Sequence, residues 1–339
     1  MGHRAGIDID LDTSERWPSS VHAARRFILE GIAGASAVDE PQAERERISR
    51  ADEPPVLAVP EPIEPGRFRA IDVSPAESRR ATGFGGFLDG TQEVRVTNWC
   101  AGIPIVWGTV GAAVLSRVNR RLVAWPRLGP LANKRYYLPF RYVTGMQPEL
   151  AVHPDVVDTG AADSSGAFPT RHPAALLERA FQAVQRDRER LEQTLAEHWC
   201  ERESTALYID GSITMSAAAS SPLAVGVIKS HRTLYADGGA FDVVMGLKSG
   251  KRTTVFRVKP RSRQSVGSFY VRTRNPAGHD ALFGLIRVEI SESDDISARA
   301  DEITRWIINE GSPLAMPDAR WDRMSYGISE TDEFLRAIS

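Results

Sequence analysis

Cysteines are scarce in this chain of 339 residues, which contains only Cys100 and Cys200. Two cysteines give no disulfide framework and cannot by themselves build a zinc site. The longest apolar stretch, residues 103–115, is too short to span a bilayer and is interrupted by glycine. The sequence also lacks a secretory signal, a myristoylation pattern and a P-loop. These absences predict a soluble cytoplasmic protein without a membrane partner, for which any ATP-driven movement must come from another protein.

Net charge is also small, at −2, and it is unevenly distributed. Residues 246–278 contain nine Lys and Arg side chains and no Asp or Glu. A local basic stretch on a slightly acidic protein is a natural surface for a phosphate backbone, although a solvated β-hairpin with charged edges explains it equally well. The nucleic-acid contacts that we expect in this stretch are Arg257, Lys259, Arg261, Arg263 and Arg272.

The first 80 residues are expected to form an N-terminal helical extension. Ser19 and Ser20 can cap a helix, and residues 39–50 are compatible with a second, weaker one. Five prolines between residues 54 and 65 predict an extended linker. Residues 81–339 then form the main domain.

Strands and helices succeed one another in this main domain. The pattern predicts three strands joined by tight turns, at 84–89, 93–99 and 103–113. A long helix over 173–200 and a strand over 206–210 follow. Further strands are expected at 223–228, 243–247, 252–259, 268–274 and 282–290, and closing helices at 296–309 and 318–338. This order is typical of the ribonuclease H-like fold, an α/β fold with a mixed sheet flanked by helices.

Two short segments with nearly the same pattern, Phe87–Thr91 and Tyr208–Ser212, carry the main chemical signal. In each, an aromatic and aliphatic pair leads into Asp, Gly and a hydroxyl residue. Such a pattern is typical of a buried strand that ends by presenting a carboxylate while glycine lets the chain turn away. Asp-Gly is also a common turn dipeptide. The element order nevertheless predicts that Asp89 and Asp210 meet in space.

The long helix offers several glutamates to complete a carboxylate group. A five-residue strand rises about 15 Å, which equals the length of about ten helical residues. Counting back from the helix end places the level of Asp210 near residue 190. We therefore expect Glu192 in the site, because it borders the apolar stripe of the helix, and Glu178 is the alternative.

Clustered carboxylates repel one another and are usually satisfied by Mg²⁺ or Mn²⁺, which prefer oxygen ligands. Two such ions can activate water and stabilise a leaving oxygen in phosphodiester hydrolysis. Lys229 could hold the scissile phosphate, or it could be an ordinary surface lysine at a strand end. On the closing helix, Asp322 is the preferred fourth acid, since Asp318 could equally be a helix cap.

From residue 83 to the end, the chain resembles the NurA nucleases. The resemblance is carried by short motifs in a common order: Phe87–Thr91, Leu207–Ser212, Val225–Ser230, Ser268–Arg272, Ile286–Ile290, and Pro313–Leu314 before a helix with Ile328, Ser329 and Glu333. It implies a Mn²⁺-dependent nuclease that acts on DNA ends in repair or phage defence. It also implies a homodimer that docks on a hexameric HerA-type ATPase.

Carried over by position, the resemblance makes Asp89, Glu192 and Asp210 metal ligands. Thr91 stands where the family usually has serine, and Asp322 or Arg320 stands where a histidine is common. Two alternatives stay open: a NurA-like subunit that binds DNA and its ATPase without cutting, and an RNA-cleaving relative.

Overall fold

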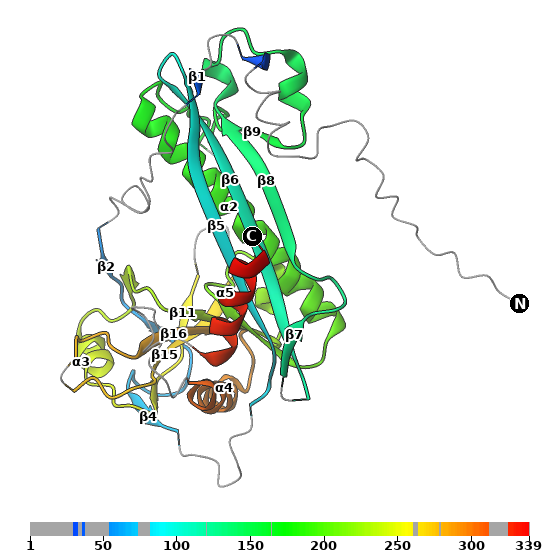
Figure 1. Cartoon of the computed structure of the whole chain (residues 1–339). Coiled ribbons are helices and arrows are strands. Elements are labelled where there is room, and N and C mark those ends of the chain that lie inside the picture. The colour runs from blue at the N-terminus through cyan, green and yellow to red at the C-terminus, as the bar shows by residue number, and fades with distance from the viewer. Residues whose placement is uncertain are drawn as a thin grey trace, which may run out of the picture. The chain divides into compact units, whose positions relative to one another are not determined.

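The computed structural model describes residues 30–32, 36–37, 54–73, 82–119, 121–163, 165–259, 264–277, 279–311 and 325–338. They belong to two compact units of a mixed α/β protein (Figure 1). One unit contains residues 1–49, 93–109 and 133–185, and the other contains residues 50–92, 110–132 and 186–339. The chain passes between the units within three strands and one long helix, namely β5 (Phe84–Cys100), β6 (Ile103–Val118), β8 (Leu131–Leu138) and α2 (Pro173–Arg202).

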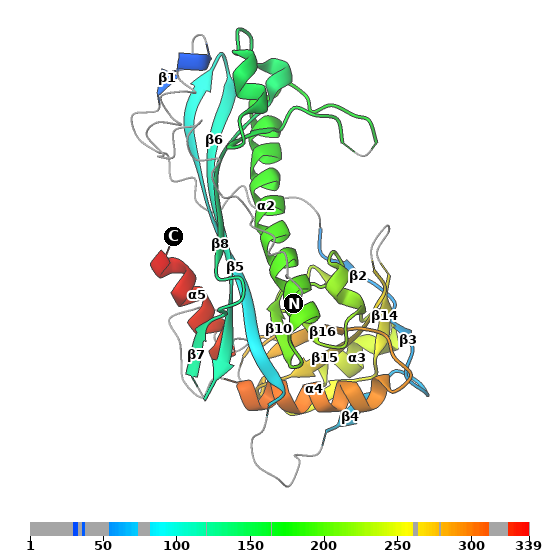
Figure 2. The ribbon, with the colours of Figure 1, turned by 90° about the vertical axis from the view of Figure 1, so that its right-hand side faces the viewer.

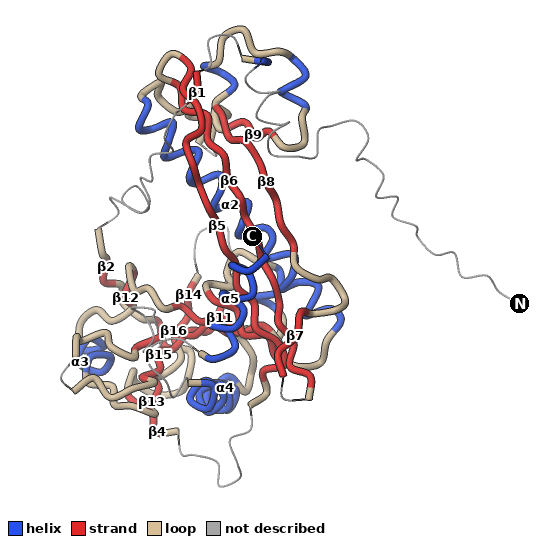
Figure 3. The backbone as a smooth tube through the Cα atoms, in the orientation of Figure 1, coloured by secondary structure: helices blue, strands red, loops and turns tan. Residues whose placement is uncertain are grey.

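The larger unit is built on a mixed sheet. Its centre is β10 (Ala206–Asp210), which pairs in parallel with β5 on one side and with β11 (Ala224–Ile228) on the other. Antiparallel strands extend the sheet from β11 through β16 (Leu285–Ile290) and β15 (Val266–Arg272) to β14 (Phe256–Val258) (Figure 3). On the far side of β5 lie β6 and the short β7 (Arg121–Ala124).

Helices cover both faces of this sheet. Alternate residues of β10 point to opposite faces, because the side-chain period of a strand is two. Leu207 and Ile209 pack in one core cluster with Trp199 of α2. Tyr208 packs in a second cluster with Ile303 of α4 (Ile296–Glu310), which lies along β15 in Figure 2. A third helix, α5 (Tyr326–Ile338), adds Ile328 to that second cluster.

The proline-rich residues expected as a linker are extended, and they are hydrogen-bonded to the larger unit. They form β2 (Val56–Leu57), β3 (Glu61–Pro62) and β4 (Ala70–Asp72), which pair with β12 (Thr233–Leu234), β14 and β13 (Lys251–Thr253). Between these strands, the buried Glu64 receives two hydrogen bonds from the guanidinium of Arg252, at 2.8 and 2.9 Å.

The smaller unit has its own core. Here β8 pairs in parallel with β9 (Val156–Asp158), and the two-residue β1 (Ser36–Ala37) pairs antiparallel with the end of β5. Two 3₁₀ turns, Phe140–Tyr142 and Pro148–Val152, connect β8 to β9. Apolar side chains of β6 and β8 pack on the start of α2 in this core, among them Ile105, Tyr136 and Leu176.

Two expectations about elements are corrected. Residues 84–89 and 93–99 belong to one strand, β5, so the turn expected at Gly90 is absent, and β6 is followed by the short β7 and by β8. Residues 243–247 lie mostly in a short helix, α3 (Gly239–Met245), whose buried Val244 belongs to the core cluster of Leu207 and Trp199. The helix expected over 318–338 lies partly outside the described residues, and its described part is α5. No helix among the described residues is long and apolar enough to cross a membrane.

Candidate carboxylate site

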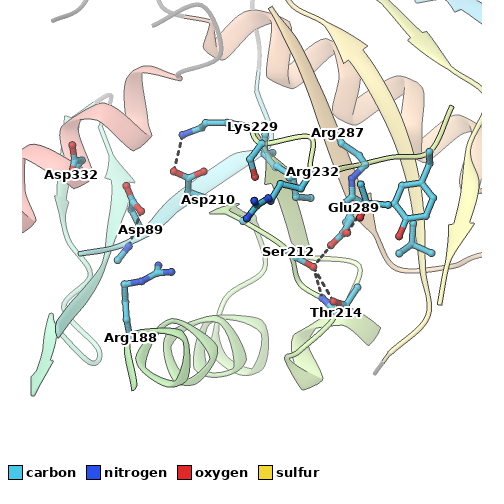
Figure 4. A pocket seen from close by; sticks show the side chains of 18 of the residues that line it. Asp89, Arg188, Asp210, Ser212, Thr214, Lys229, Arg232, Arg287, Glu289 and Asp332 are labelled. Atoms are coloured by element: carbon cyan, nitrogen blue, oxygen red, sulfur yellow. Dashed lines mark hydrogen bonds and ion pairs between the residues drawn. The ribbon is translucent and has the colours of Figure 1, made fainter. Parts of the chain in front are cut away.

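Asp89 and Asp210 lie side by side in the larger unit. The parallel register of β5 and β10 pairs Leu88 with Ile209, and each aspartate is the next residue in its strand. Neighbouring residues at one level of a parallel pair point to the same face, so the two carboxyl groups face the same pocket (Figure 4). The sequence prediction that these two residues meet is confirmed.

The two Asp-Gly dipeptides lie at different positions in their strands. After Asp210 the strand ends as expected, and Gly211 has a φ of +136°, a conformation that favours glycine. Asp89 instead lies inside β5, which continues for eleven residues to Cys100. Gly90 lies close to Glu192, because a Cβ built there would meet Oε1 of Glu192 and the end of that side chain would have to shift.

Glu192 is the helix glutamate that lies against this site. Its side chain is 15% exposed and forms an ion pair with Arg188, one turn earlier on α2. Arg188 also donates from Nε to Oε1 of Gln92 in β5, at 3.1 Å. Glu178, the alternative, is exposed and accepts a hydrogen bond from Gln182. The sequence argument from helical rise therefore selected the glutamate that the structure places beside Gly90.

The carboxyl groups of the site resist ionisation together. Burial, and then the negative charge of Asp210, raise the pKa of Asp89 well above its usual value. The Asp89 carboxylate accepts a 2.7 Å hydrogen bond from the Gly90 amide and makes no ion pair with the described residues. Burial also raises the pKa of Glu192 to about 7, against the opposing effect of Arg188. Burial and mutual repulsion therefore disfavour the charged forms of these carboxyl groups. A bound cation would remove that penalty.

Lys229 directly follows β11 and is not a surface lysine. Its side chain is 4% exposed, and its Nζ lies 2.7 Å from Oδ2 of Asp210. A buried ammonium at this position offsets part of the negative charge that Asp89 and Asp210 share.

The closing helix supplies an acid that the sequence reading did not select. Asp332 of α5 lines the pocket and pairs with Arg336, four residues later. Asp322, the predicted fourth acid, lies outside the described residues, as do Asp318 and Arg320. The signal for Asp332 was its place in the same expected C-terminal helix, but no local pattern favours its level over that of Asp318 or Asp322.

A second missed feature is the network around Glu289 of β16, which is 1% exposed. Oε2 of Glu289 accepts hydrogen bonds from Ser212 Oγ at 2.8 Å and from the Ile213 amide at 3.0 Å. Oε1 accepts from Nη1 of Arg287 at 2.8 Å. Glu289 therefore holds the loop that follows Asp210. The alternation of β16 places this acid on the face of Arg287, opposite the apolar Ile286, Val288 and Ile290, so the local pattern did not indicate its burial.

The basic stretch divides into exposed and enclosed members. Arg272 is fully buried, and its guanidinium donates to backbone carbonyls, including that of Phe283 at 2.7 Å. Its expected contact with a nucleic acid is therefore wrong, because Arg272 holds the loops at the end of β15. Arg257 is 35% exposed between Glu61 and Glu292, and Lys259 is exposed. Arg261 and Arg263 lie outside the described residues.

The donors of the site fit a hard divalent cation in their chemistry. Asp89, Asp210 and Glu192 offer carboxylate oxygens, and the raised pKa values of Asp89 and Glu192 are the penalty that such an ion would remove. Across the part of the chain that is described, no three His, Cys, Asp or Glu side chains are gathered closely enough to hold an ion as they stand. Arg188 forms an ion pair with Glu192, and Lys229 forms one with Asp210. These ion pairs must break before a cation can bind the same oxygens.

Comparison with known proteins does not assign this chain to a family. No family model matches the chain. No curated protein matches its sequence either. The function therefore has to be argued from the site.

Proposed function

We propose that this protein is a divalent-metal-dependent DNA nuclease of the NurA type, built on a ribonuclease H-like fold. The observation that carries the proposal is the lateral pairing of Asp89 and Asp210 on adjacent parallel strands, with Glu192 of α2 packed against Gly90. The fold alone does not require two acids at this position, because burial and mutual repulsion make them costly.

The order of elements supports the fold assignment. The long strands β5 and β6 are joined by Ala101 and Gly102, which both have positive φ, as in a tight hairpin. Apart from the short strands β7 and β9, they are followed by β8, the long helix α2, and then β10, which pairs in parallel with β5. This is the succession expected for a ribonuclease H-like core, with acids on its first strand, first long helix, fourth strand and last helix.

In the proposed reaction, Asp89, Asp210 and Glu192 hold Mn²⁺ or Mg²⁺, and Asp332 is available as a further acid. When bound, these ions supply an activated water and stabilise the leaving oxygen of a phosphodiester. Lys229 is close enough to Asp210 to approach a phosphate bound there and to stabilise its developing charge. Glu289 keeps the Asp210–Ile213 loop in place through Ser212.

The wider setting follows from the resemblance and is part of the same proposal. The protein would act as a cytoplasmic homodimer that processes DNA ends with a HerA-type hexameric ATPase, in repair or in phage defence. Arg257 and Lys259 remain candidate DNA contacts, and Arg261 and Arg263 belong to the same stretch of sequence.

One observation favours a second candidate, a subunit that binds DNA without cutting it. Arg188 and Lys229 already pair with Glu192 and Asp210, and paired cations can stand in the place of metal ions. The two functions are separated by measuring DNA cleavage with Mn²⁺ in the presence and absence of the ATPase. Cleavage that is lost in Asp89→Asn supports the nuclease, and DNA binding without cleavage in both conditions supports the binding subunit.

A further inference from the structure

The pocket beside Asp89 and Asp210 is larger than the proposed chemistry needs. Its volume is about 770 Å³. Its lining includes Ser212, Thr214, Arg232, Arg287 and Glu289 (Figure 4). Tyr235 also lines it.

Arg287 is more buried than Arg232. Its side chain is 11% exposed, and Nη1 is fixed by Glu289 at 2.8 Å. The guanidinium also lies over the ring of Tyr235, with Cζ 5.2 Å from the ring centroid. Among the described residues, Nε and Nη2 of Arg287 donate to no acceptor. A guanidinium held in place with two N–H groups to spare is suited to bind a phosphate.

The charges of the side chains that line the pocket also favour a phosphate ligand. Among the described side chains that line it, five are cationic and four are acidic. The cations are Arg188, Lys229, Arg232, Arg287 and Arg336, and the acids are Asp89, Asp210, Glu289 and Asp332. The lining is therefore slightly positive although the whole chain has a net charge of −2. A bound divalent ion would make it more positive still, which favours a ligand with several negative charges.

We infer that Arg287 and Arg232 form a subsite for the phosphate that neighbours the scissile phosphate in a DNA strand. The inference rests on the proposed function, since it places the scissile phosphate at Asp89 and Asp210. The hydroxyls of Ser212 and Thr214 are bonded to each other at 2.9 Å, so they shape the loop, and the two arginines contact the phosphate. The subsite binds the phosphate backbone of the DNA strand and does not distinguish one base from another.

The competing explanation is that Arg287 only neutralises the buried Glu289. Removing Arg287 alone would leave that carboxylate unpaired and could unfold the protein. The double variant Arg287→Gln with Glu289→Gln avoids this outcome, because both charges leave together and the net charge of the pocket is unchanged. Arg232→Gln affects an exposed side chain, and Arg127→Gln, 57% exposed and outside the pocket lining, is the matched control.

The test is binding of a fluorescein-labelled oligothymidylate by anisotropy, on the full chain in EDTA so that no strand is cut. We expect the double variant and Arg232→Gln each to raise Kd about tenfold. Each should also lower the slope of log K against log salt by about 0.7, the value of one lost phosphate contact on a single strand. Arg127→Gln should change neither quantity.

Unchanged Kd and salt slope in both pocket variants would overturn the subsite, whether or not the protein cuts DNA. If the variants weaken binding as expected but wild type never cleaves DNA, the nuclease proposal fails and the phosphate site stands. The two proposals therefore fail on different readouts.

Discussion

Replacing Glu192 with glutamine should change how the stability of the metal-free protein depends on pH. The Glu192 carboxyl has a pKa of about 7 in the folded protein against an ordinary value of 4.5, chiefly because it is buried. A difference of one in pKa corresponds to about 1.4 kcal/mol, so ionised Glu192 costs about 3 kcal/mol of folding free energy at pH 8. Glutamine keeps the shape and carries no charge.

The sign follows from which state binds more protons. Between pH 4.5 and 7 the folded protein keeps the Glu192 proton that the unfolded chain releases, so the free energy of unfolding falls as pH rises through this window. Below pH 4.5 both states are protonated and the penalty is absent. Glu192→Gln should therefore be more stable than wild type at pH 8 by up to about 3 kcal/mol, and close to wild type at pH 4.5.

Thermal unfolding in EDTA, followed by circular dichroism from pH 4.5 to 8, measures this difference. At pH 8 we expect Tm to rise by about 5 °C or more, since 1 kcal/mol shifts Tm by a few degrees in a protein of this size. Glu178→Gln, an exposed glutamate on the same helix, is the control and should show no such pH-dependent gain. A Glu192→Gln variant that is less stable than wild type at pH 8 would show that the ion pair with Arg188 outweighs the cost of burying the Glu192 carboxylate.

Three further outcomes are expected. Adding Mn²⁺ at 100 times its Kd should stabilise wild type by about 2.7 kcal/mol in thermal unfolding, and a similar gain in Asp89→Asn would remove Asp89 from the ligands. Arg272→Ala should destabilise the protein by about 3 kcal/mol in urea unfolding, because several buried carbonyls lose their donor, and normal stability would contradict its structural role. Arg252→Met should cost about 3–5 kcal/mol by leaving Glu64 charged and buried, which Glu64→Gln in the same chain should partly reverse.

The sequence was most informative where local chemistry and tertiary position agree. Asp210 could be placed at a strand end because four apolar residues lead into it and Gly211, whose backbone needs positive φ, follows it. Glu192 could be selected because helical rise per residue is nearly constant. Both predictions depend on local quantities, the run of apolar residues in a strand and the rise per residue of a helix, which the surrounding structure does not alter.

It was least informative where a residue type serves two purposes. Gly90 was taken as a turn, yet it lies in a continuous strand and makes room for Glu192. Nothing in the local sequence distinguishes a turn glycine from one required by a packed helix. Arg272 looked like its basic neighbours, and only the fold encloses it with carbonyl groups.

Contacts between residues that are distant in sequence could not be predicted from local sequence patterns either. Glu289 follows the Asp210 loop by more than seventy residues, and their contact depends on the order of β10, β11 and β16 in the sheet. The strands of residues 54–73 were missed because they are only two or three residues long and lie in a proline-rich segment. Their stability comes from partners such as Arg252, which an extended proline-rich segment does not reveal.

The most direct test of the central claim is cleavage of end-labelled linear DNA by the purified protein in Mn²⁺, Mg²⁺ or EDTA, beside Asp210→Asn. Asparagine keeps the size of the side chain at the end of β10, so the variant should fold, which circular dichroism checks. We expect cleavage with Mn²⁺ or Mg²⁺, none in EDTA, and at least a hundredfold loss in Asp210→Asn. Cleavage that persists in EDTA or in Asp210→Asn would contradict the carboxylate site as the catalytic centre.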